Sequence, residues 1–394
     1  MGCCQKKKTN EPLIDKNEKK NENNNNQDQE QTINYENIKL AYTDFEPLKL
    51  LGTGSFGRVV LVRYKNNNKL YAMKILSKTQ IKLKKQEEHT ITERNLMVRL
   101  NCPFVVNIKF AFQDESRLYI VTDFMQGGDM FYHLHCCGTR KFTESKAKFY
   151  IIELVLGLEF LHKQIIIYRD LKPENILMDY DGHIKISDFG LSKLVDDSDD
   201  KTFTLCGTPQ YLSPEILKNK GYDKTIDWWA LGCIIYEMLT GVLPFHIPKG
   251  NKINPKIYEQ SVNYPPEMSP DAIDLVKQLL NPNPKKRLGY GDNGVENIKQ
   301  HKFFKGVNWN KYLNKEIKPP LIPQLDGEMD LKYFDKIFTD EPVQNERPTA
   351  MSKDRRNSYY KGFTFVTESI GKEMDNYTNE NEEQVEIEIS NQNV

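Results

Sequence analysis

Several short polar motifs of this chain combine residue types that can act on a nucleoside triphosphate. The glycines of Gly52-Thr53-Gly54-Ser55-Phe56-Gly57 lack a Cβ, so backbone N–H groups there can approach phosphate oxygens closely. Lys74 follows in Tyr71-Ala72-Met73-Lys74-Ile75-Leu76, where strand alternation places it on the same face as Ala72. Its ammonium group could bind the α- and β-phosphates and pair with Glu93, which lies in a helical pattern. These residues predict a phosphate-binding cleft.

A second group of side chains could supply a base and the ligands of a metal ion. Asp170 is the candidate base, because a carboxylate can accept the proton of an attacking hydroxyl. Asn175 and Asp188 carry the oxygen atoms that Mg²⁺ prefers, and Asp188 follows the apolar strand pattern His183-Ile184-Lys185-Ile186. Lys172 is placed to steady the γ-phosphate. Phosphoryl transfer needs positioning and charge neutralisation more than covalent chemistry, so this set predicts a phosphotransferase site.

Each motif alone has an ordinary structural explanation. The glycines alone describe a hairpin turn, Lys74 alone an exposed strand lysine, and Asp188 alone a solvated turn residue. Their common order and spacing along one chain make the phosphotransferase interpretation specific.

The hydrophobic pattern predicts the elements that hold these side chains. Apolar positions alternate from Leu48 to Leu61 in a hairpin with the glycines at its turn, and helical spacing covers residues 84–100. We therefore predict an α+β fold in which a small β-rich lobe precedes a larger helical lobe. Further strands are expected at Leu70–Leu76, Leu118–Phe124 and His183–Ile186, and further helices at Ala147–His162 and Thr225–Thr240.

Composition bounds the remaining possibilities. The 394 residues are 38% hydrophobic, enough for one large folded unit with extensions, and carry a formal net charge of zero. Charge therefore indicates no nucleic-acid partner, and no apolar run has the length of a membrane span. The cysteines show no metal-ligand spacing, and no secretory signal opens the chain, so we expect an intracellular monomer with reduced thiols. Residues 1–44 and 371–394 are expected to be disordered, with a catalytic domain at 45–304 and a tail at 305–370.

The motifs together resemble the protein kinase signature, ending in Asp188-Phe189-Gly190 and Ser213-Pro214-Glu215. Tyr168 at the start of the Tyr-Arg-Asp motif, and the segment Lys201–Pro209, are similar to the AGC family of serine/threonine kinases. The resemblance covers residues 45 to about 366. It implies a two-lobed kinase fold, ATP and Mg²⁺ as cofactors, and protein substrates. The positions that it assigns to the nucleotide are Leu51, Gly52, Gly54, Ser55, Gly57, Val59, Ala72, Lys74, Glu93, Asp123 and Met125.

The tail extends the resemblance beyond the catalytic lobes. Asp330–Thr339 resembles the family's active-site tether, in which positions matching Phe334 and Phe338 lie over or near the nucleotide. Tyr360-Lys361-Gly362-Phe363-Thr364-Phe365 resembles the hydrophobic motif of the protein kinase B, ribosomal S6 kinase and serum/glucocorticoid kinase branch. Tyr360 replaces the usual leading Phe, and Ser213 replaces the Ala of the Ala-Pro-Glu signature. No Ser/Thr-Pro turn motif precedes the hydrophobic motif, which leaves Thr349 and Ser352 as weak candidate phosphosites.

The resemblance also implies control by an upstream kinase and a preference for basic substrates. Thr204 and Thr364 match the family's activating phosphosites, with Arg169, Lys193 and His89 as expected partners of phosphorylated Thr204. Asp129, Glu174 and Glu237 match acidic positions that receive arginines two or three residues before the acceptor. An apolar pocket for the following residue is expected from Leu205, Pro209 and Leu212, and Ser358 fits the same substrate pattern as an autophosphorylation site.

The first residues suggest a membrane anchor. Met1-Gly2-Cys3-Cys4 offers an N-terminal glycine for myristoylation and two thiols for palmitoylation, followed by Lys6-Lys7-Lys8. One acyl chain binds membranes only marginally, so a second signal is needed for stable attachment. Position 6 departs from the myristoylation pattern, which wants Ser or Thr there, and an unmodified start is the alternative. We expect lipidation at Gly2, Cys3 and Cys4, and attachment to the cytoplasmic face of a membrane.

Two alternatives to an active protein kinase stay open in the sequence. The first is a catalytically inactive scaffold of the same fold, which usually lacks Lys74, Asp170 or Asp188; this chain has all three. The second is a kinase for small molecules, against which the segment Thr208–Glu215 resembles a protein-substrate platform.

Overall fold

The computed structural model describes residues 40–54, 56–138, 140–195, 201–246, 257–258, 260–343 and 360–371, all within one compact unit that spans Tyr35–Val394. The expected lipidation sites Gly2, Cys3 and Cys4 lie outside the described residues. So do Ser55 of the glycine-rich loop and the candidate phosphosites Thr349, Ser352 and Ser358.

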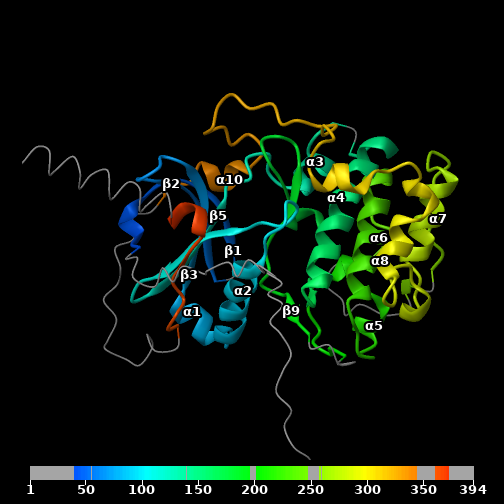
Figure 1. Cartoon of the computed structure of the whole chain (residues 1–394), viewed down its shortest axis with the longest axis horizontal. Helices are drawn as coiled ribbons and strands as arrows, with labels where there is room; N and C mark the ends of the chain where they lie inside the picture. Colours follow the sequence, from blue (N-terminus) through cyan, green and yellow to red (C-terminus); the bar gives the residue numbers. More distant parts are fainter. Residues whose placement is uncertain are drawn as a thin grey trace, which may run out of the picture. The chain divides into compact units, whose positions relative to one another are not determined.

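A six-stranded antiparallel sheet forms the small lobe, in the order β1-β2-β3-β5-β4-β10 (Figure 1). One of its hydrophobic clusters is rich in aromatic rings, with Phe45 stacked on Phe112 at 5.5 Å and Phe112 stacked on Tyr119 at 4.6 Å. Such rings bury large apolar areas and stiffen the sheet. The strands are β1 (Phe45–Gly54), β2 (Gly57–Tyr64), β3 (Leu70–Ser77), β4 (Ile108–Gln113), β5 (Arg117–Asp123) and β10 (Phe365–Val366).

Two helices follow β3 and carry Glu93 to the sheet. Helix α1 (Lys78–Leu83) begins at Ser77, whose hydroxyl accepts a hydrogen bond from the N–H of Gln80. Helix α2 (Glu87–Arg99) buries Glu93, Leu96 and Met97. The predicted single helix over 84–100 was wrong at its start, because Lys85 has φ +54° and a left-handed residue does not continue a helix.

The large lobe consists mainly of helices, with four short strands that shape the loops of the site. Helix α6 is apolar on every face and nearly all of its residues are buried, as expected of the centre of a helical core. The main helices are α3 (Met130–His135), α4 (Glu144–Lys163), α5 (Pro214–Leu217), α6 (Thr225–Thr240), α7 (Pro270–Leu279), α8 (Gly294–Lys299) and α9 (Trp309–Leu313). The strands β6 (Ile166–Ile167) and β9 (Lys193–Leu194) pair with each other, as do β7 (Ile176–Met178) and β8 (Ile184–Ile186).

Short 3-10 helices complete the described elements. They are η1 (Tyr42–Asp44), η2 (Pro173–Asn175), η3 (Pro209–Tyr211), η5 (Pro284–Lys286) and η6 (Lys302–Phe304). No helix among the described residues is both long enough and apolar enough to cross a membrane.

The tail runs back from the helical lobe to the sheet, with helix α10 (Lys336–Thr339) beside the strands in Figure 1. Gln126 donates to the carbonyl oxygen of Gly327 at 2.5 Å, and the Phe334 ring stacks on Phe124 at 5.7 Å. The Lys49 ammonium group donates to the carbonyl oxygen of Thr339 at 3.2 Å. These contacts hold residues 327–339 against the segment that joins the two lobes. The predicted two-lobed α+β fold with its tail is confirmed.

Candidate active site

Three charged side chains from separate elements meet in the cleft. The Nζ of Lys74, on β3, lies 2.6 Å from Oε1 of Glu93, on α2, and 3.3 Å from Oδ1 of Asp188, which follows β8. Burial alone would lower the pKa of Lys74, but the two carboxylates outweigh burial and raise it. Lys74 is therefore a permanent cation in the cleft.

Asp188 is held ionised and in a strained conformation. The nearby Lys74 cation lowers its pKa, while burial opposes the shift. Its φ of +53° is costly for a residue with a Cβ, at roughly 1–3 kcal/mol. The Gly190 N–H donates to Asp188 Oδ1 at 3.3 Å. Phe189, which lies between these two residues in the chain, is buried against Tyr168. Packing of Phe189 thus fixes the turn that directs the Asp188 carboxylate to Lys74.

Four hydrogen bonds fix the carboxylate of Asp170. Its Oδ1 accepts from the backbone N–H of Thr208 at 3.0 Å and from the Thr208 hydroxyl at 2.7 Å. Its Oδ2 accepts from Lys172 Nζ at 2.8 Å and from the Asn175 side-chain amide at 3.0 Å. These bonds hold the carboxylate in one orientation, from which Asp170 can accept the proton of a hydroxyl placed beside it.

Asp227, which the sequence analysis missed, anchors the loop that carries Asp170. From inside α6 its carboxylate accepts hydrogen bonds from the backbone N–H groups of Tyr168 at 3.0 Å and Arg169 at 2.9 Å, and contacts His162 at 2.8 Å. Arg169 has φ +71°, so these bonds offset a strained backbone directly before the base. An acid inside a largely apolar helical pattern was the available signal, because buried carboxylates are rare unless they have partners.

The predicted nucleotide residues border two adjoining cavities. A cavity of about 340 Å³ is lined at one end by apolar side chains and at the other by Lys74, Glu93, Asn175 and Asp188. A second, of about 430 Å³, adjoins it under the glycine-rich loop. The first contains the predicted Leu51, Gly52, Val59, Ala72, Asp123 and Met125, together with Phe334 of the tail, and the second contains Gly54 and Gly57.

The glycines of the loop serve different purposes. A Cβ on Gly57 would lie 1.8 Å from the carbonyl oxygen of Ile75, so packing between β2 and β3 requires glycine there. A Cβ on Gly52 would meet nothing within 4 Å, and one on Gly54 only the Gly57 carbonyl oxygen at 3.9 Å. Packing therefore does not require glycine at these two positions, and the open space beside them would let a phosphate approach the backbone closely.

The donor set at the charged end of the cavity fits ATP with a divalent cation. Asn175 and Asp188 line the same cavity, and their amide and carboxylate groups are the oxygen donors that Mg²⁺ takes. Lys74 supplies a fixed cation for the phosphates, and the apolar end suits a purine ring. Asp123 lines this cavity, but its carboxylate pairs with Lys109 at 3.3 Å and Lys185 at 3.2 Å, so its side chain serves a surface ion-pair network.

The three acids expected to receive substrate arginines lie close to one another around α3. Asp129 is the N-cap of α3, and its Oδ1 accepts a hydrogen bond from the Tyr132 N–H at 2.8 Å. Asp129 and the exposed Glu174 both line the cavity of about 340 Å³. Burial, with a contribution from Glu174, raises the pKa of Asp129 to about 6. Glu237 is buried in α6 and bonded to His135 and Tyr211.

Thr204 is exposed, and its backbone is tied to groups next to the base. The Tyr222 hydroxyl donates to the Thr204 carbonyl oxygen at 2.7 Å and lies 3.3 Å from Nη1 of Arg169. Among the other expected phosphate partners, Lys193 contacts the Thr202 hydroxyl at 3.2 Å. His89 contacts Gln86 at 2.7 Å and lines the cavity under the glycine-rich loop. Of the predicted apolar pocket, Leu205 and Pro209 are exposed, whereas Leu212 is buried in a small cluster with Ile216 and Tyr222.

The hydrophobic motif docks on the small lobe. Tyr360 and Phe363 are buried, and β10 adds Phe365 and Val366 as an edge strand against β4. Arg94, next to Glu93 on α2, donates from Nε to the Phe363 carbonyl oxygen at 3.1 Å and from Nη2 to the Thr364 carbonyl oxygen at 2.9 Å.

On the other side of the motif, the Gln113 amide donates to the Tyr360 carbonyl oxygen at 2.8 Å, and the Lys78 ammonium group lies 5.3 Å from the Tyr360 ring centroid. The tail thus contacts the helix that positions Glu93. Arg94 and Gln113 were not predicted, because no sequence signal connects them to a motif some 250 residues away.

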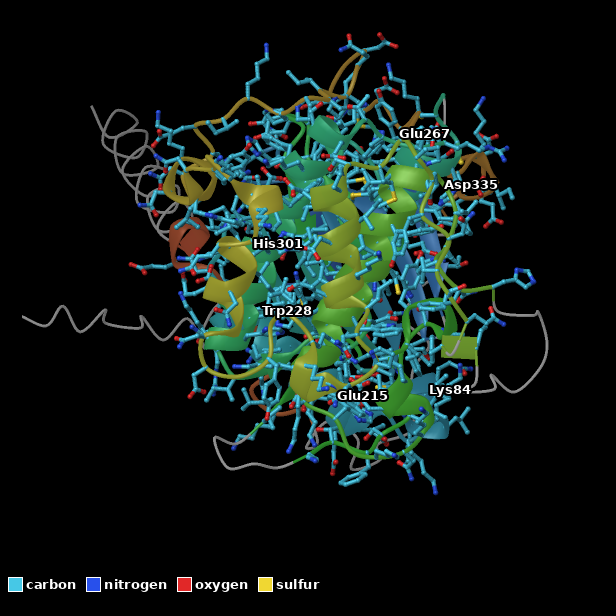
Figure 2. The ribbon with its side chains drawn as sticks, turned by 90° about the vertical axis from the view of Figure 1, so that its right-hand side faces the viewer. Lys84, Glu215, Trp228, Glu267, His301 and Asp335 are labelled. Atoms are coloured by element: carbon cyan, nitrogen blue, oxygen red, sulfur yellow. The ribbon has the colours of Figure 1, made fainter. Side chains whose placement is uncertain are left out.

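A buried ion pair anchors the Ser213-Pro214-Glu215 segment. Both oxygens of Glu215, labelled in Figure 2, accept from Arg287, at 2.6 Å from Nη1 and 2.9 Å from Nη2. The Arg287 side chain is fully buried beside the Trp229 ring. Such a fork-to-fork pair fixes geometry as well as charge. Glu215 was expected as part of a signature motif, but nothing in the sequence indicated that Arg287 is its partner.

Comparison with known proteins agrees with this geometry. The protein kinase domain family matches residues 45–304, and the protein kinase C terminal domain matches residues 325–365. A RAC family serine/threonine-protein kinase homolog of Dictyostelium discoideum is 44% identical, over 84% of this chain and 74% of the relative. Serine/threonine-protein kinase YPK2/YKR2 of Saccharomyces cerevisiae is also 44% identical, over 85% of this chain but 49% of the relative, so the chain spans about half the length of that protein. Serine/threonine-protein kinase AtPK2/AtPK19 of Arabidopsis thaliana is 42% identical, over 82% of this chain and 68% of the relative. The chain therefore belongs to the protein kinase family, as a serine/threonine kinase of the AGC type.

Proposed function

We propose that this kinase transfers the γ-phosphoryl group of Mg·ATP to serine and threonine hydroxyls that follow arginines in protein substrates. The observation that carries the proposal is the grouping of Asp129, Glu174 and Glu237 around α3, next to the cavity that holds Asn175 and Asp188. Bound Mg·ATP would supply the phosphoryl donor and neutralise its charge.

Each charged residue of the site would have a separate role, which its position determines. Asp170 would orient the acceptor hydroxyl and take its proton, because its carboxylate is held in place by Thr208, Lys172 and Asn175. Lys172, 2.8 Å from Asp170, is placed to stabilise charge near the transferred group. Lys74 would hold the phosphates, and its contact with Glu93 keeps the ammonium group in position.

Carboxylates near the base favour arginine in the substrate. A guanidinium group can bond a carboxylate through two parallel N–H donors, a geometry that lysine cannot copy. Asp129 matches the position for an arginine three residues before the acceptor, and Glu174 and Glu237 match that for an arginine two before it. Glu174 contributes to the raised pKa of both Asp129 and Glu237, so it lies near both carboxylates.

A positional peptide library tests the substrate class directly. We expect purified kinase with Mg·ATP to enrich arginine two and three residues before the phosphorylated serine or threonine, and an apolar residue directly after it. Enrichment of proline after the acceptor, or no arginine upstream, would overturn the proposed specificity. Transfer to metabolites but to no peptide would favour a small-molecule kinase.

The raised pKa of Asp129 makes the arginine preference at the third upstream position sensitive to pH. Because its pKa is about 6, above the ordinary value, the carboxylate is charged at pH 7.5 and loses its charge as the pH falls through 6. The ionised fraction of such a group falls roughly fourfold between pH 7.5 and pH 5.5. We expect the ratio of kcat/KM for peptides with arginine or alanine at this position to fall by about the same factor.

The Asp129→Asn variant is the matched control, since it keeps a side chain that can cap α3 but cannot ionise. Its arginine-to-alanine ratio should be low and nearly independent of pH. A wild-type ratio that stays flat, or a pH-dependent ratio in the variant, would assign the third-position arginine to another residue.

The alternative of an inactive scaffold is disfavoured by the contacts in the cleft. Lys74 already lies within hydrogen-bonding distance of Glu93 and Asp188, and Asp170 accepts hydrogen bonds on both carboxylate oxygens. An upstream kinase acting on Thr204 and Thr364 would then place this enzyme in a signalling relay. Measured γ-phosphate transfer by the purified chain decides between the two.

A further inference from the structure

The carboxylate of Glu237 is bonded on both oxygens by its own chain. Its Oε1 lies 2.8 Å from Nε2 of His135, in the last turn of α3, and its Oε2 accepts from the Tyr211 hydroxyl at 2.7 Å. Only 4% of the Glu237 side chain is exposed, against 23% of the His135 side chain. The imidazole of His135 therefore lies between the Glu237 carboxylate and the solvent.

His135 is held in this covering position from its other side. Its ring lies 4.6 Å from that of Phe131, one turn earlier on α3, and Phe131 itself is 40% exposed. Since the backbone of α3 is fixed by the Asp129 cap and by its contacts with η2 and β7, the side chain of His135 is the part free to move. A rotation of that side chain would expose Oε1 of Glu237.

We propose that His135 is a specificity-determining residue that occupies the Glu237 subsite, so that a substrate arginine two residues before the acceptor must displace it. This inference rests on the proposed preference for basic substrates and refines one of its subsites. A guanidinium group cannot bond both oxygens of Glu237 while the imidazole stays at 2.8 Å from Oε1. The arginine therefore competes with the imidazole for the same carboxylate oxygen.

The outcome of this competition depends on the charge of the imidazole. Histidine is the side chain that ordinarily changes charge between about pH 5 and pH 8. As a cation it forms a charge-assisted bond with Glu237, which is roughly twice as strong as one from a neutral donor.

The surrounding groups also shift the pKa of Glu237. Burial raises the pKa of Glu237, Glu174 adds to the rise, and the contacts with Tyr211 and His135 oppose it. Loss of charge from Glu237 at low pH would therefore weaken arginine binding as well, so a pH profile alone does not isolate His135. The titratable groups that interact with the pair are Tyr211 on η3, Glu174 on η2 and Cys233 on α6.

A substitution that fixes the charge isolates the contribution of His135. Two peptides that share arginine at the third upstream position and differ by arginine or alanine at the second give a kcat/KM ratio for the Glu237 subsite. At pH 8 we expect His135→Arg to lower this ratio about five- to tenfold relative to wild type, because a permanent cation then bonds the carboxylate. His135→Ala, which leaves Oε1 of Glu237 open, should exceed the wild-type ratio at pH 8 and at pH 6.5. Each ratio is measured on one enzyme preparation, so a difference in folded fraction cancels.

Two further measurements separate this inference from the proposed function. The matched change His246→Arg, at another exposed histidine, should leave the ratio unchanged, and no His135 variant should change the arginine-to-alanine ratio at the third position. A wild-type enzyme without any upstream arginine preference would contradict the proposed function itself. A clear third-position preference combined with equal second-position ratios for wild type, His135→Arg and His135→Ala at both pH values would overturn this inference alone.

Discussion

Asp188→Ala is expected to lower kcat for phosphoryl transfer on the order of 10³-fold, with little loss of stability. Its carboxylate is ionised by its proximity to Lys74 and lines the cavity together with Asn175, so the substitution removes charge where the metal and phosphates must be held. Removal of one preorganised electrostatic group from an active site commonly costs about 10²–10³-fold in rate. Lys74→Met should have a comparable effect, since it leaves the phosphates without their fixed cation.

Stability should change little because neither side chain belongs to the apolar core. The Asp188 side chain is 52% exposed, and its replacement by alanine does not leave Lys74 unpaired, since Glu93 remains 2.6 Å away. Single-turnover transfer from labelled ATP and thermal unfolding measure the two quantities separately. Asp181→Asn, which breaks only a 3.8 Å surface contact with Lys315, is the control and should stay within twofold of wild type. Activity of Asp188→Ala within a few-fold of wild type would contradict the metal-site assignment.

The elements that the sequence predicted well are those with one dominant period. Strands β2 and β3 alternate, and α4 and α6 carry long apolar helical patterns, so their existence and type followed from spacing. Strand β4 was missed because Phe110, Ala111 and Phe112 are all buried. A strand covered on both faces does not alternate, and only the tertiary structure shows what covers it.

Helix α7 was also missed, although its signals are local. Ser269 caps it through the Ala272 N–H, Pro270 occupies its first position, and Ala272, Leu275, Val276 and Leu279 are buried at helical spacing. The start of α2 is a different case, because the left-handed residue Lys85 that separates it from α1 carries no glycine or asparagine signal.

In the site, the motif residues were predictable from the sequence, but the residues that hold them in position were not. Lys74, Asp170, Asn175 and Asp188 lie in short motifs whose chemistry is readable from residue type and order. Thr208 and Asp227 act on Asp170 only because folding brings segments 38 and 57 positions away to the same loop. A buried carboxylate such as Asp227, bonded to two backbone N–H groups, contributes roughly 1.5–3 kcal/mol per bond to holding that loop.

The hydrophobic motif combines a pattern that can be recognised in the sequence with contacts that cannot. Its aromatic pattern identified it as a resemblance to the family's hydrophobic motif, and Tyr360 in place of the usual phenylalanine is buried below Lys78. The strand pairing of β10 with β4, and the hydrogen bonds from the Arg94 and Gln113 side chains, are contacts to backbone groups that side-chain patterns do not encode. Because these contacts come from protein groups, a phosphate on Thr364 is expected to strengthen the docking through Arg94 rather than to provide all of it.

The double variant Thr204→Ala, Thr364→Ala is expected to lose about 10²-fold in kcat relative to the phosphorylated wild-type kinase. A phosphate adds about −1.5 to −2 charges, and one on Thr204 would lie near Arg169, whose guanidinium already bonds the Leu191 carbonyl oxygen at 2.5 Å and the Tyr222 hydroxyl at 3.3 Å. That link would join the loop of Thr204 to the segments that carry Asp170 and Asp188. Two charge-assisted hydrogen bonds at roughly 1.5 kcal/mol each correspond to about 10²-fold.

Phosphatase treatment supplies the matched control for this prediction. Dephosphorylated wild-type kinase should fall to the level of the double variant, whereas the double variant should not respond to phosphatase. Thr364→Ala alone should cost less than Thr204→Ala alone, because Tyr360, Phe363 and the β10 pairing continue to hold the motif against α2 and thereby keep Glu93 beside Lys74. Full activity of the double variant, measured with a peptide that carries arginines upstream of its serine, would refute control at both threonines. A larger loss from Thr364→Ala than from Thr204→Ala would instead mean that the position of α2, and not the order of the Thr204 loop, limits the rate.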